Sequence, residues 1–98
     1  MPDTPDTDMP DAYPIRFSEE FAEGLARIWS PRVLDQIQHL TSLLPTTPEM
    51  GSADVRKSLI TRYGPNLRKL PVSTFVIVYR FDGVTVEVLA LEYGPGIT

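Results

Sequence analysis

Two runs of β-branched and aromatic residues in the carboxyl-terminal third of the chain predict a β-hairpin. The runs span residues 74–81 and 84–91, and their composition is typical of strands. The Asp-Gly pair between them favours a two-residue type I′ turn, which would place Phe81 opposite Val84. One face of the hairpin is then apolar throughout and must be covered, whereas the other is apolar only far from the turn.

The helical spacing of apolar residues upstream predicts a cover for the first face. Ser18, followed by two glutamates, is typical of a helix start, and Ser30-Pro31 ends this helix and begins a second one. Two amphipathic helices joined by so short a turn form a helical hairpin. Their apolar stripes are Phe21, Leu25, Ile28 and Trp29, then Val33, Ile37, Leu40 and Leu44. We expect Leu25 and Trp29 to be buried against the first strand of the β-hairpin.

Weaker patterns complete the predicted fold. Residues 13–17 alternate apolar and polar positions around a proline, which favours a strand at a sheet edge. Residues 45–53 form a loop, and residues 54–63 suit a short helix capped by Asp54. Residues 67–72 alternate weakly and lead into the hairpin as a strand. The prediction is an α+β fold with an N-terminal edge strand, a helical hairpin and an antiparallel sheet of three consecutive strands.

Composition limits the chain to one small domain. Its 98 residues are 42% hydrophobic and include no cysteine, so a thiolate metal site is excluded. Residues 1–12 carry four aspartates, no base and almost nothing to bury, which predicts a disordered acidic tail before a domain over residues 13–98. An acidic arm that competes for a basic groove of the same protein is the alternative. With no run of membrane-spanning length, we expect a cytoplasmic protein and no membrane contact.

Few side chains suggest catalysis. The single histidine, His39, has no second histidine or cysteine to complete a metal site, and the glutamates after Ser18 are expected to be solvated at a helix start. No phosphate-binding glycine loop or nucleophile elbow is present, and we expect no metal and no cofactor. Basic residues remain, and Arg80 is placed to form a surface ion pair with Glu87. The basic group, which could meet an anionic partner, is Arg56, Lys57, Arg62, Arg68, Lys69 and Arg80.

Over residues 13–93, the chain resembles the RelE/ParE superfamily of bacterial toxins. The carrying stretches are residues 64–72, then the apolar strand ending in Tyr79-Arg80, the Asp-Gly turn and residues 86–89. The segments 17–22 and 48–51 sit where this family places its first strand-to-helix junction and its loop after the helices. The resemblance implies a toxin of a type II toxin–antitoxin system that is neutralised by a cognate antitoxin.

Members of that superfamily differ in their targets. The RelE-like branch cleaves messenger RNA in the ribosome with basic residues and often a tyrosine or histidine, whereas the ParE-like branch is associated with DNA gyrase. By resemblance, a nuclease set here would be Lys69, Arg68, Arg80 and Tyr93. The set is incomplete, because Val76 stands where an arginine is expected and Tyr93 and Gly96 replace a histidine and an arginine. Tyr93 would act as a base only if nearby cations lowered its pKa.

The favoured hypothesis is therefore a ParE-like toxin that inhibits growth by binding an essential target such as DNA gyrase. The first alternative is a ribosome-dependent messenger RNA endoribonuclease. The second is an inactive relative that retains only antitoxin binding.

The second face of the predicted β-hairpin is the candidate partner surface. Neither helix can cover it if both lie on the first face, and an apolar patch left in water by a small monomer favours a partner segment or a second copy. An antitoxin helix or added strand would lie there, with acidic side chains meeting the bases of residues 67–72. The candidate partner-binding residues are Val76, Val78, Leu89, Leu91, Arg68 and Lys69.

Overall fold

The computed structural model describes residues 12–93 of the chain and contains helices and strands in the predicted order. Residues 1–11 of the predicted tail lie outside the described part, as do residues 94–98. The elements are β1 (Ile15–Phe17), α1 (Glu19–Ala26), α2 (Pro31–Leu43), α3 (Lys57–Tyr63), β2 (Leu67–Val72), β3 (Phe75–Phe81) and β4 (Val86–Tyr93). The predicted α+β fold is confirmed, and the bounds of β2 match the prediction at both ends.

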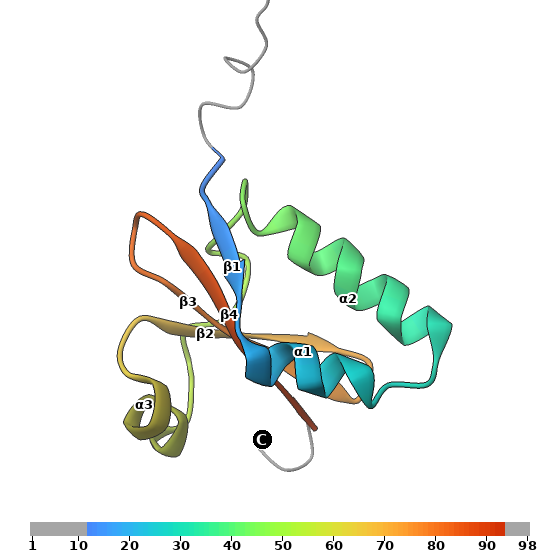
Figure 1. Cartoon of the computed structure of the whole chain (residues 1–98). Coiled ribbons are helices and arrows are strands. Elements are labelled where there is room, and N and C mark those ends of the chain that lie inside the picture. The colour runs from blue at the N-terminus through green and yellow to red at the C-terminus, as the bar shows by residue number, and fades with distance from the viewer. Residues whose placement is uncertain (1–11, 94–98) are drawn as a thin grey trace, which may run out of the picture.

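The strands form one four-stranded sheet in the order β1-β4-β3-β2. Consecutive strands β2, β3 and β4 are antiparallel, as predicted. The short β1 pairs with β4 in parallel, so that Ile15 lies opposite Val86 (Figure 1). Pro14, which has no N–H to donate, precedes this edge strand and accepts a hydrogen bond from Val86 through its carbonyl.

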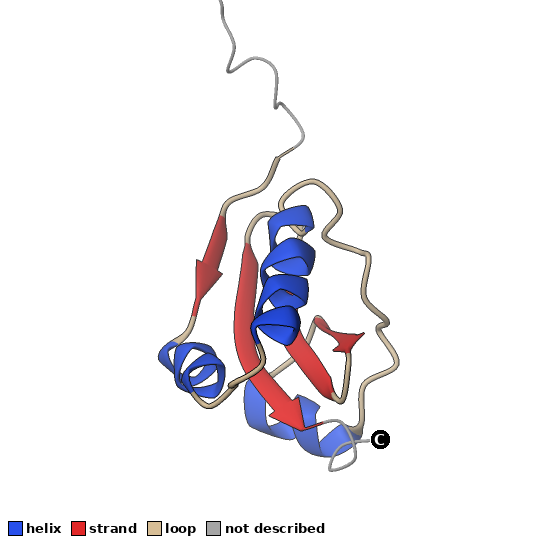
Figure 2. Ribbon diagram, turned by 90° about the vertical axis from the view of Figure 1, so that its right-hand side faces the viewer, coloured by secondary structure: helices blue, strands red, loops and turns tan. Residues whose placement is uncertain are grey.

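Helices α1 and α2 cover one face of the sheet and enclose the larger apolar core. Ser18 caps α1 by accepting a hydrogen bond from the N–H of Phe21, and Ser30 caps α2 with Pro31 in the first turn. Figure 2 shows α2 lying along the sheet, and α1 at the end of β1. The predicted cover of the first face is therefore confirmed. The core that the two helices enclose contains Phe21, Ile37, Leu44, Leu70, Val72, Ile77, Tyr79, Val86 and Val88.

Helix α3 lies on the opposite face, where it covers a smaller apolar cluster (Figure 1). The helix predicted for residues 54–63 is confirmed, but it begins at Lys57. Its N-cap residue is Arg56 instead of Asp54, and no side-chain hydrogen bond caps it. Gly64, at a φ of 97°, ends the helix in a conformation that glycine adopts without strain. The cluster contains Leu59, Leu67, Val76, Val78, Leu89 and Ala90, with Val55 and Tyr63 at its margin.

The predicted register of the β-hairpin is wrong. Phe81 pairs with Val86 instead of Val84, so the connection has four residues. Asp82 favours this longer loop because its carboxylate accepts hydrogen bonds from the N–H groups of Val84 and Thr85, an alternative to the tight turn that aspartate side chains commonly provide.

A β-bulge further along changes the face of the last residues. The register shifts between Val78 and Tyr79, so one extra residue of β4 is accommodated there. Ala90 consequently packs in the cluster under α3, and Leu91 packs against the core under α1 and α2. The sequence pattern had placed Leu91 on the second face of the hairpin.

The prediction that Trp29 is buried is also wrong. Helix α1 ends at Ala26, where the N–H groups of Arg27 and Ile28 bond to carbonyls three residues earlier. Pro31 disfavours a helical conformation at the residue before it, and Ser30 is extended, with ψ of 116°. Trp29 therefore lies in the turn and is 92% exposed. Leu25 packs against the core, as predicted, although it is only partly buried.

Candidate functional site

The four residues of the possible nuclease set do not converge. Lys69 lies opposite Val78, and Arg80 lies opposite Leu67, which places both on the face that α3 covers. Arg68 lies opposite Tyr79 on the other face. This arrangement separates Arg68 from Lys69 and Arg80 by the thickness of the sheet.

Tyr93 lies at the far end of the sheet from Arg80. It pairs with Phe75, and the centroids of their rings are 6.0 Å apart. Phe75 and Arg80 are five positions apart on β3, which corresponds to roughly 17 Å along a strand. Tyr93 therefore has none of the other three members of the set beside it.

Two of the arginines are held by contacts within the protein. Arg80 forms an ion pair with Glu87, as predicted, and also donates to the carbonyl of Tyr63, 2.7 Å away. Arg68 donates to the carbonyl oxygens of Gly51 at 2.7 Å and Glu49 at 3.3 Å, so that it fixes the loop before α3. Both guanidinium groups thus serve the fold.

The apolar patch predicted to need a partner is covered by the chain itself. Val76, Val78 and Leu89 are 5%, 0% and 8% exposed beneath α3, so the expectation that they lie in water is wrong. Leu91 lies on the other side of the sheet, with its Cβ 3.1 Å from the position that a Cβ on Gly24 would take. The reason for the error is that a seven-residue helix suffices to cover so small a cluster.

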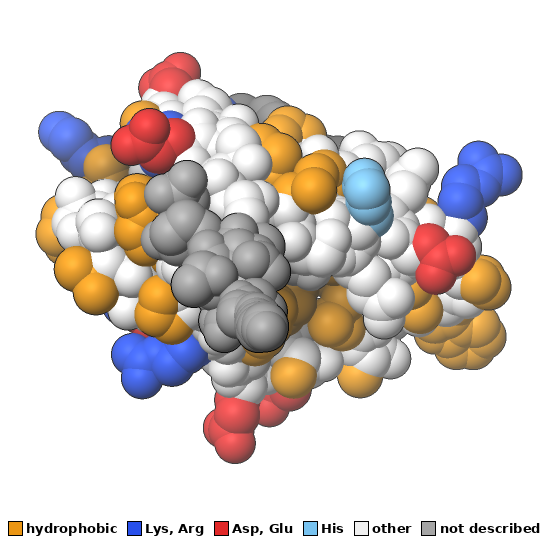
Figure 3. Space-filling view, turned by 90° about the horizontal axis from the view of Figure 1, so that it is seen from above, with side chains coloured by type: hydrophobic (Ala, Val, Ile, Leu, Met, Phe, Trp, Pro, Cys, Tyr) orange, Lys and Arg blue, Asp and Glu red, His pale blue; other side chains and the backbone are white. Residues whose placement is uncertain are grey.

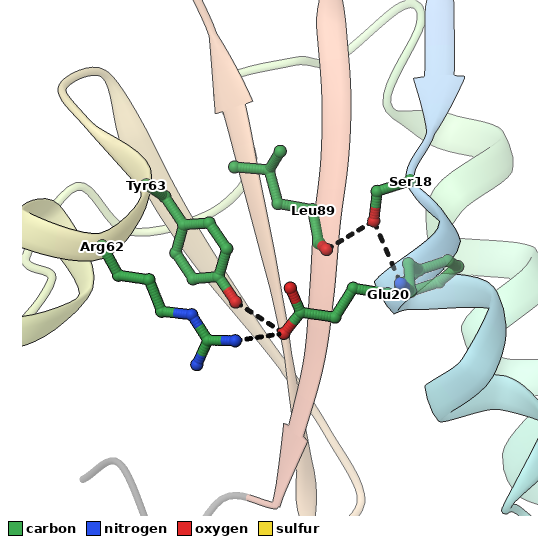
Figure 4. A network of polar contacts seen from close by, with 6 residues as sticks. Ser18, Glu20, Arg62, Tyr63 and Leu89 are labelled. Atoms are coloured by element: carbon green, nitrogen blue, oxygen red, sulfur yellow. Dashed lines mark hydrogen bonds and ion pairs between the residues drawn. The ribbon is translucent and has the colours of Figure 1, made fainter.

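A polar network joins α1 to α3 across β4 (Figure 4). The Glu20 carboxylate accepts hydrogen bonds from the Tyr63 hydroxyl at 2.7 Å and from Arg62 at 3.0 Å. Burial raises the pKa of Tyr63 and, together with the bond to Glu20, which favours the protonated hydroxyl, brings it to about 12. Glu20 thus connects α1 to α3, whereas the sequence analysis predicted a solvated glutamate.

The buried hydroxyl of Tyr79 holds the loop between α2 and α3. It donates to the carbonyl of Pro48 at 2.7 Å and accepts from the N–H of Gly51 at 2.8 Å. Burial raises the pKa of this fully enclosed tyrosine. A Cβ at Gly51 would approach the carbonyl oxygen of Lys69 within 2.7 Å and the ring of Tyr79 within 2.9 Å, so the close approach requires glycine.

The surface carries scattered charges and one prominent aromatic side chain. Figure 3 shows basic side chains at widely separated points on one face, and the histidine on the surface. His39 is exposed on α2, as predicted. An open hollow of about 560 Å³ lies between the start of α2 and the β2–β3 turn, and its lining includes Ser30, Arg32 and Ser73.

Within residues 12–93, no three His, Asp or Glu side chains lie together in a way that could hold a metal ion. Within the same range, every helix is too short or too polar to cross a membrane.

The sequence analysis did not predict that Trp29 lies on the surface, or that Glu20 links α1 to α3. The signal for Trp29 was available, because Pro31 two residues later limits how far the preceding helix can extend. The Glu20–Tyr63 contact joins residues 43 positions apart, and no local pattern indicates such a pair.

Comparisons with known proteins support one family. The similar solved structures include three with TM-scores of 0.65, 0.60 and 0.54. The first is the RelBE2 toxin–antitoxin complex of Mycobacterium tuberculosis, at 21% identity over 84% of this chain and 98% of that chain. The second is the chromosomal ParDE system of P. aeruginosa, at 17% identity over 85% of this chain and 97% of that chain. The third is the intact E. coli RelBE complex, at 21% identity over 83% of this chain and 95% of that chain. At these identities the likeness shows the fold.

A comparison with curated protein sequences gives no significant match. The family profile described as the ParE toxin of type II toxin–antitoxin system, parDE, matches residues 15–94. That span includes all seven helices and strands of the described residues. The chain therefore belongs to the ParE toxin family, within the RelE/ParE superfamily.

Proposed function

We propose that this toxin inhibits growth by binding an essential protein, with DNA gyrase as the favoured target, and that it does not cleave RNA. The observation that carries the proposal is the separation of Lys69, Arg68, Arg80 and Tyr93. Ribonucleolysis needs a base and phosphate-stabilising cations around one ribose. Among residues 12–93, these four side chains lie on two faces and at two ends of the sheet.

A cognate antitoxin is the second part of the proposal. The similar solved structures are of toxin–antitoxin complexes, which supports an antitoxin as the partner that restrains this chain. The patch of Val76, Val78 and Leu89 is not offered as its docking surface, because α3 already occupies that face. Lys69 is partly exposed at the outer edge of the sheet, and it stays a candidate for contact with an acidic antitoxin segment.

Expression of the chain alone in a bacterial host tests the proposal. We expect growth to stop, DNA-damage signalling to rise first, and messenger RNA to stay intact within the ribosome. Co-expression of the protein encoded by the adjacent small gene should restore growth.

A variant with Lys69, Arg68, Arg80 and Tyr93 each replaced is unsuitable as a control, because Arg68 and Arg80 hold the fold. Tyr93→Phe and Lys69→Ala are the suitable pair. Both should retain growth arrest if the toxin acts by binding. Early arrest of translation with cut messenger RNA, lost in either variant, would instead establish the endoribonuclease. A chain that leaves growth unaffected but binds the antitoxin would be the inactive relative.

A further inference from the structure

Trp29 is the most exposed of the large apolar side chains in the described part of the chain. It is 92% exposed, compared with 65% for Val84 and 52% for Phe17. An indole removes on the order of 150 to 250 Å² from water when it is buried in an interface, and tryptophan is enriched among the residues that dominate binding energy. Such a side chain favours a surface that becomes buried when a partner binds.

The turn that carries Trp29 is preorganised. Ser30 accepts a hydrogen bond from the N–H of Val33 at 3.3 Å, and Pro31 fixes the start of α2. The turn lies between α1 and α2 at one end of the molecule, away from α3 (Figure 1). A partner that buries the indole therefore need not order a flexible loop first, which lowers the entropic cost of binding.

Two arginines flank the indole. Arg27 and Arg32 are both exposed, and neither forms an ion pair or a side-chain hydrogen bond within residues 12–93. Residues 24–34 contain these two bases and no acid. The turn thus presents an aromatic ring between two exposed arginines that form no ion pair within residues 12–93, and the nearest acids in the sequence are Glu23 and Asp35.

We propose that Trp29, Arg27 and Arg32 form an anchor that enters an apolar pocket with an acidic rim on the folded target protein of this toxin. This inference rests on the proposed binding function and assigns the part of the toxin that contacts the target. The indole holds the complex, and the arginines steer association and orient the toxin.

A folded target fits the anchor better than the other two possible occupants. The anchor projects from the end of a helical hairpin, and a projecting side chain needs a concave site, which a short antitoxin segment lacks. A second copy offers the hollow at the start of α2, but Arg32 lines that hollow. Self-association there would place arginines of the two copies, which are like charges, close together.

Variants at the anchor test the proposal in the intact chain. Trp29→Ala should reduce target affinity by about 30-fold or more, the size typical of an interface hot spot, and should raise the expression level needed for growth arrest. Trp29→Phe should recover part of the effect. Arg27→Glu with Arg32→Glu should slow association and reverse its salt dependence. Val84→Ala is the matched control, because it shortens an exposed apolar side chain elsewhere and should change nothing.

Antitoxin binding and the melting temperature serve as controls for folding. Because the indole makes so little contact with the protein, Trp29→Ala should retain both. Loss of either would overturn the proposal, because Trp29 would then hold the fold or the antitoxin. Equal growth arrest by the wild type and Trp29→Ala would overturn the anchor and leave the proposed function standing. A wild-type chain without any effect on growth would overturn both.

Photo-crosslinking identifies the contact. A photoreactive amino acid at position 29, with position 84 as control, is presented to purified DNA gyrase, to the antitoxin and to the chain alone. We expect crosslinks to gyrase from position 29 only. Crosslinks from position 29 to the antitoxin or to a second copy, or an absence of crosslinks to gyrase, would overturn the assignment.

Discussion

The two faces of the sheet are covered in different ways. On one face, the capped helices α1 and α2 enclose a core of nine buried residues, and α2 alone is 13 residues long. On the other face, the seven-residue α3 has no side-chain N-cap, and Leu59 is its one buried residue. Polar contacts from Glu20 and Arg80 reach this helix. An apolar core holds the helices on the first face, whereas on the second face a small apolar cluster is combined with hydrogen bonds from Glu20 and Arg80 to α3.

The difference bears on function, because a covered second face leaves no apolar patch for a partner. Helix α3 takes the place that an antitoxin segment was expected to fill. Partner contacts must then come from elsewhere, and the turn between α1 and α2 offers the largest exposed apolar side chain. The comparison of the two faces can be tested by substitutions, which follow from the largest expected effect to the smallest.

Val78→Asp tests whether α3 covers the apolar cluster on the second face of the sheet. Val78 is fully buried, so the substitution would place a carboxylate in an apolar cluster without a counter-charge, which costs several kcal/mol. We expect the chain to fail to fold, as measured by circular dichroism and urea unfolding. Val84→Asp, at a 65% exposed position, should stay within about 0.5 kcal/mol of the wild type. A folded Val78→Asp protein would mean that α3 leaves this face readily.

Phe21→Ala and Leu59→Ala compare the two covers directly. Phe21 is 2% exposed in the larger core, and its truncation should cost about 3 to 5 kcal/mol. Leu59→Ala should cost about 2 kcal/mol, the low end for leucine, because the small cluster at the surface can relax. Urea denaturation gives both values. Equal losses would contradict the unequal roles of the two faces.

Tyr79→Phe tests the buried tie between β3 and the loop after α2. Removing the hydroxyl leaves the Pro48 carbonyl and the Gly51 N–H without their partner, and we expect a loss of about 1 to 3 kcal/mol. Hydrogen exchange should show faster opening at Gly51. Tyr13→Phe is the control, since no hydrogen bond of the Tyr13 hydroxyl is present within residues 12–93. Unchanged exchange at Gly51 would show that the loop is held by packing alone.

Glu20→Gln should have the smallest effect, a loss of about 0.5 to 1.5 kcal/mol. It also changes the response to alkaline pH. Because the folded protein raises the pKa of Tyr63 to about 12, this group stabilises the fold fully below about pH 10, and the contribution is lost as the pH rises toward 12. Glu20→Gln should lower that pKa and flatten the alkaline decline, as followed by phenolate absorbance and urea unfolding. An identical titration in both proteins would rule out the Glu20 tie.

Much of the fold could be predicted because it depends on local patterns. Apolar spacing and the capping serines predicted α1 and α2, and alternation predicted β2. The hairpin register could not be read, because Asp82 can support either a tight turn or a four-residue loop. The bulge near Leu89 depends on how the two strands fit in three dimensions.

The candidate site was predicted less well, because it depends on contacts between distant residues. The separation of Lys69 and Tyr93 becomes visible only when strand pairing is known. The coverage of Val78 depended on a helix whose start, at Lys57, has no capping signal. Trp29 fits the apolar stripe of α1 by spacing alone, and the early end of that helix places it in solvent.

The central claim is that this toxin acts by binding and not by cutting RNA. The most direct measurement adds purified chain to two reactions side by side, messenger RNA translated on ribosomes and plasmid DNA supercoiled by DNA gyrase, and reads RNA ends and DNA topology. We predict intact messenger RNA and dose-dependent inhibition of gyrase, abolished by the antitoxin. Messenger RNA cut at the ribosome with gyrase unaffected would contradict the claim.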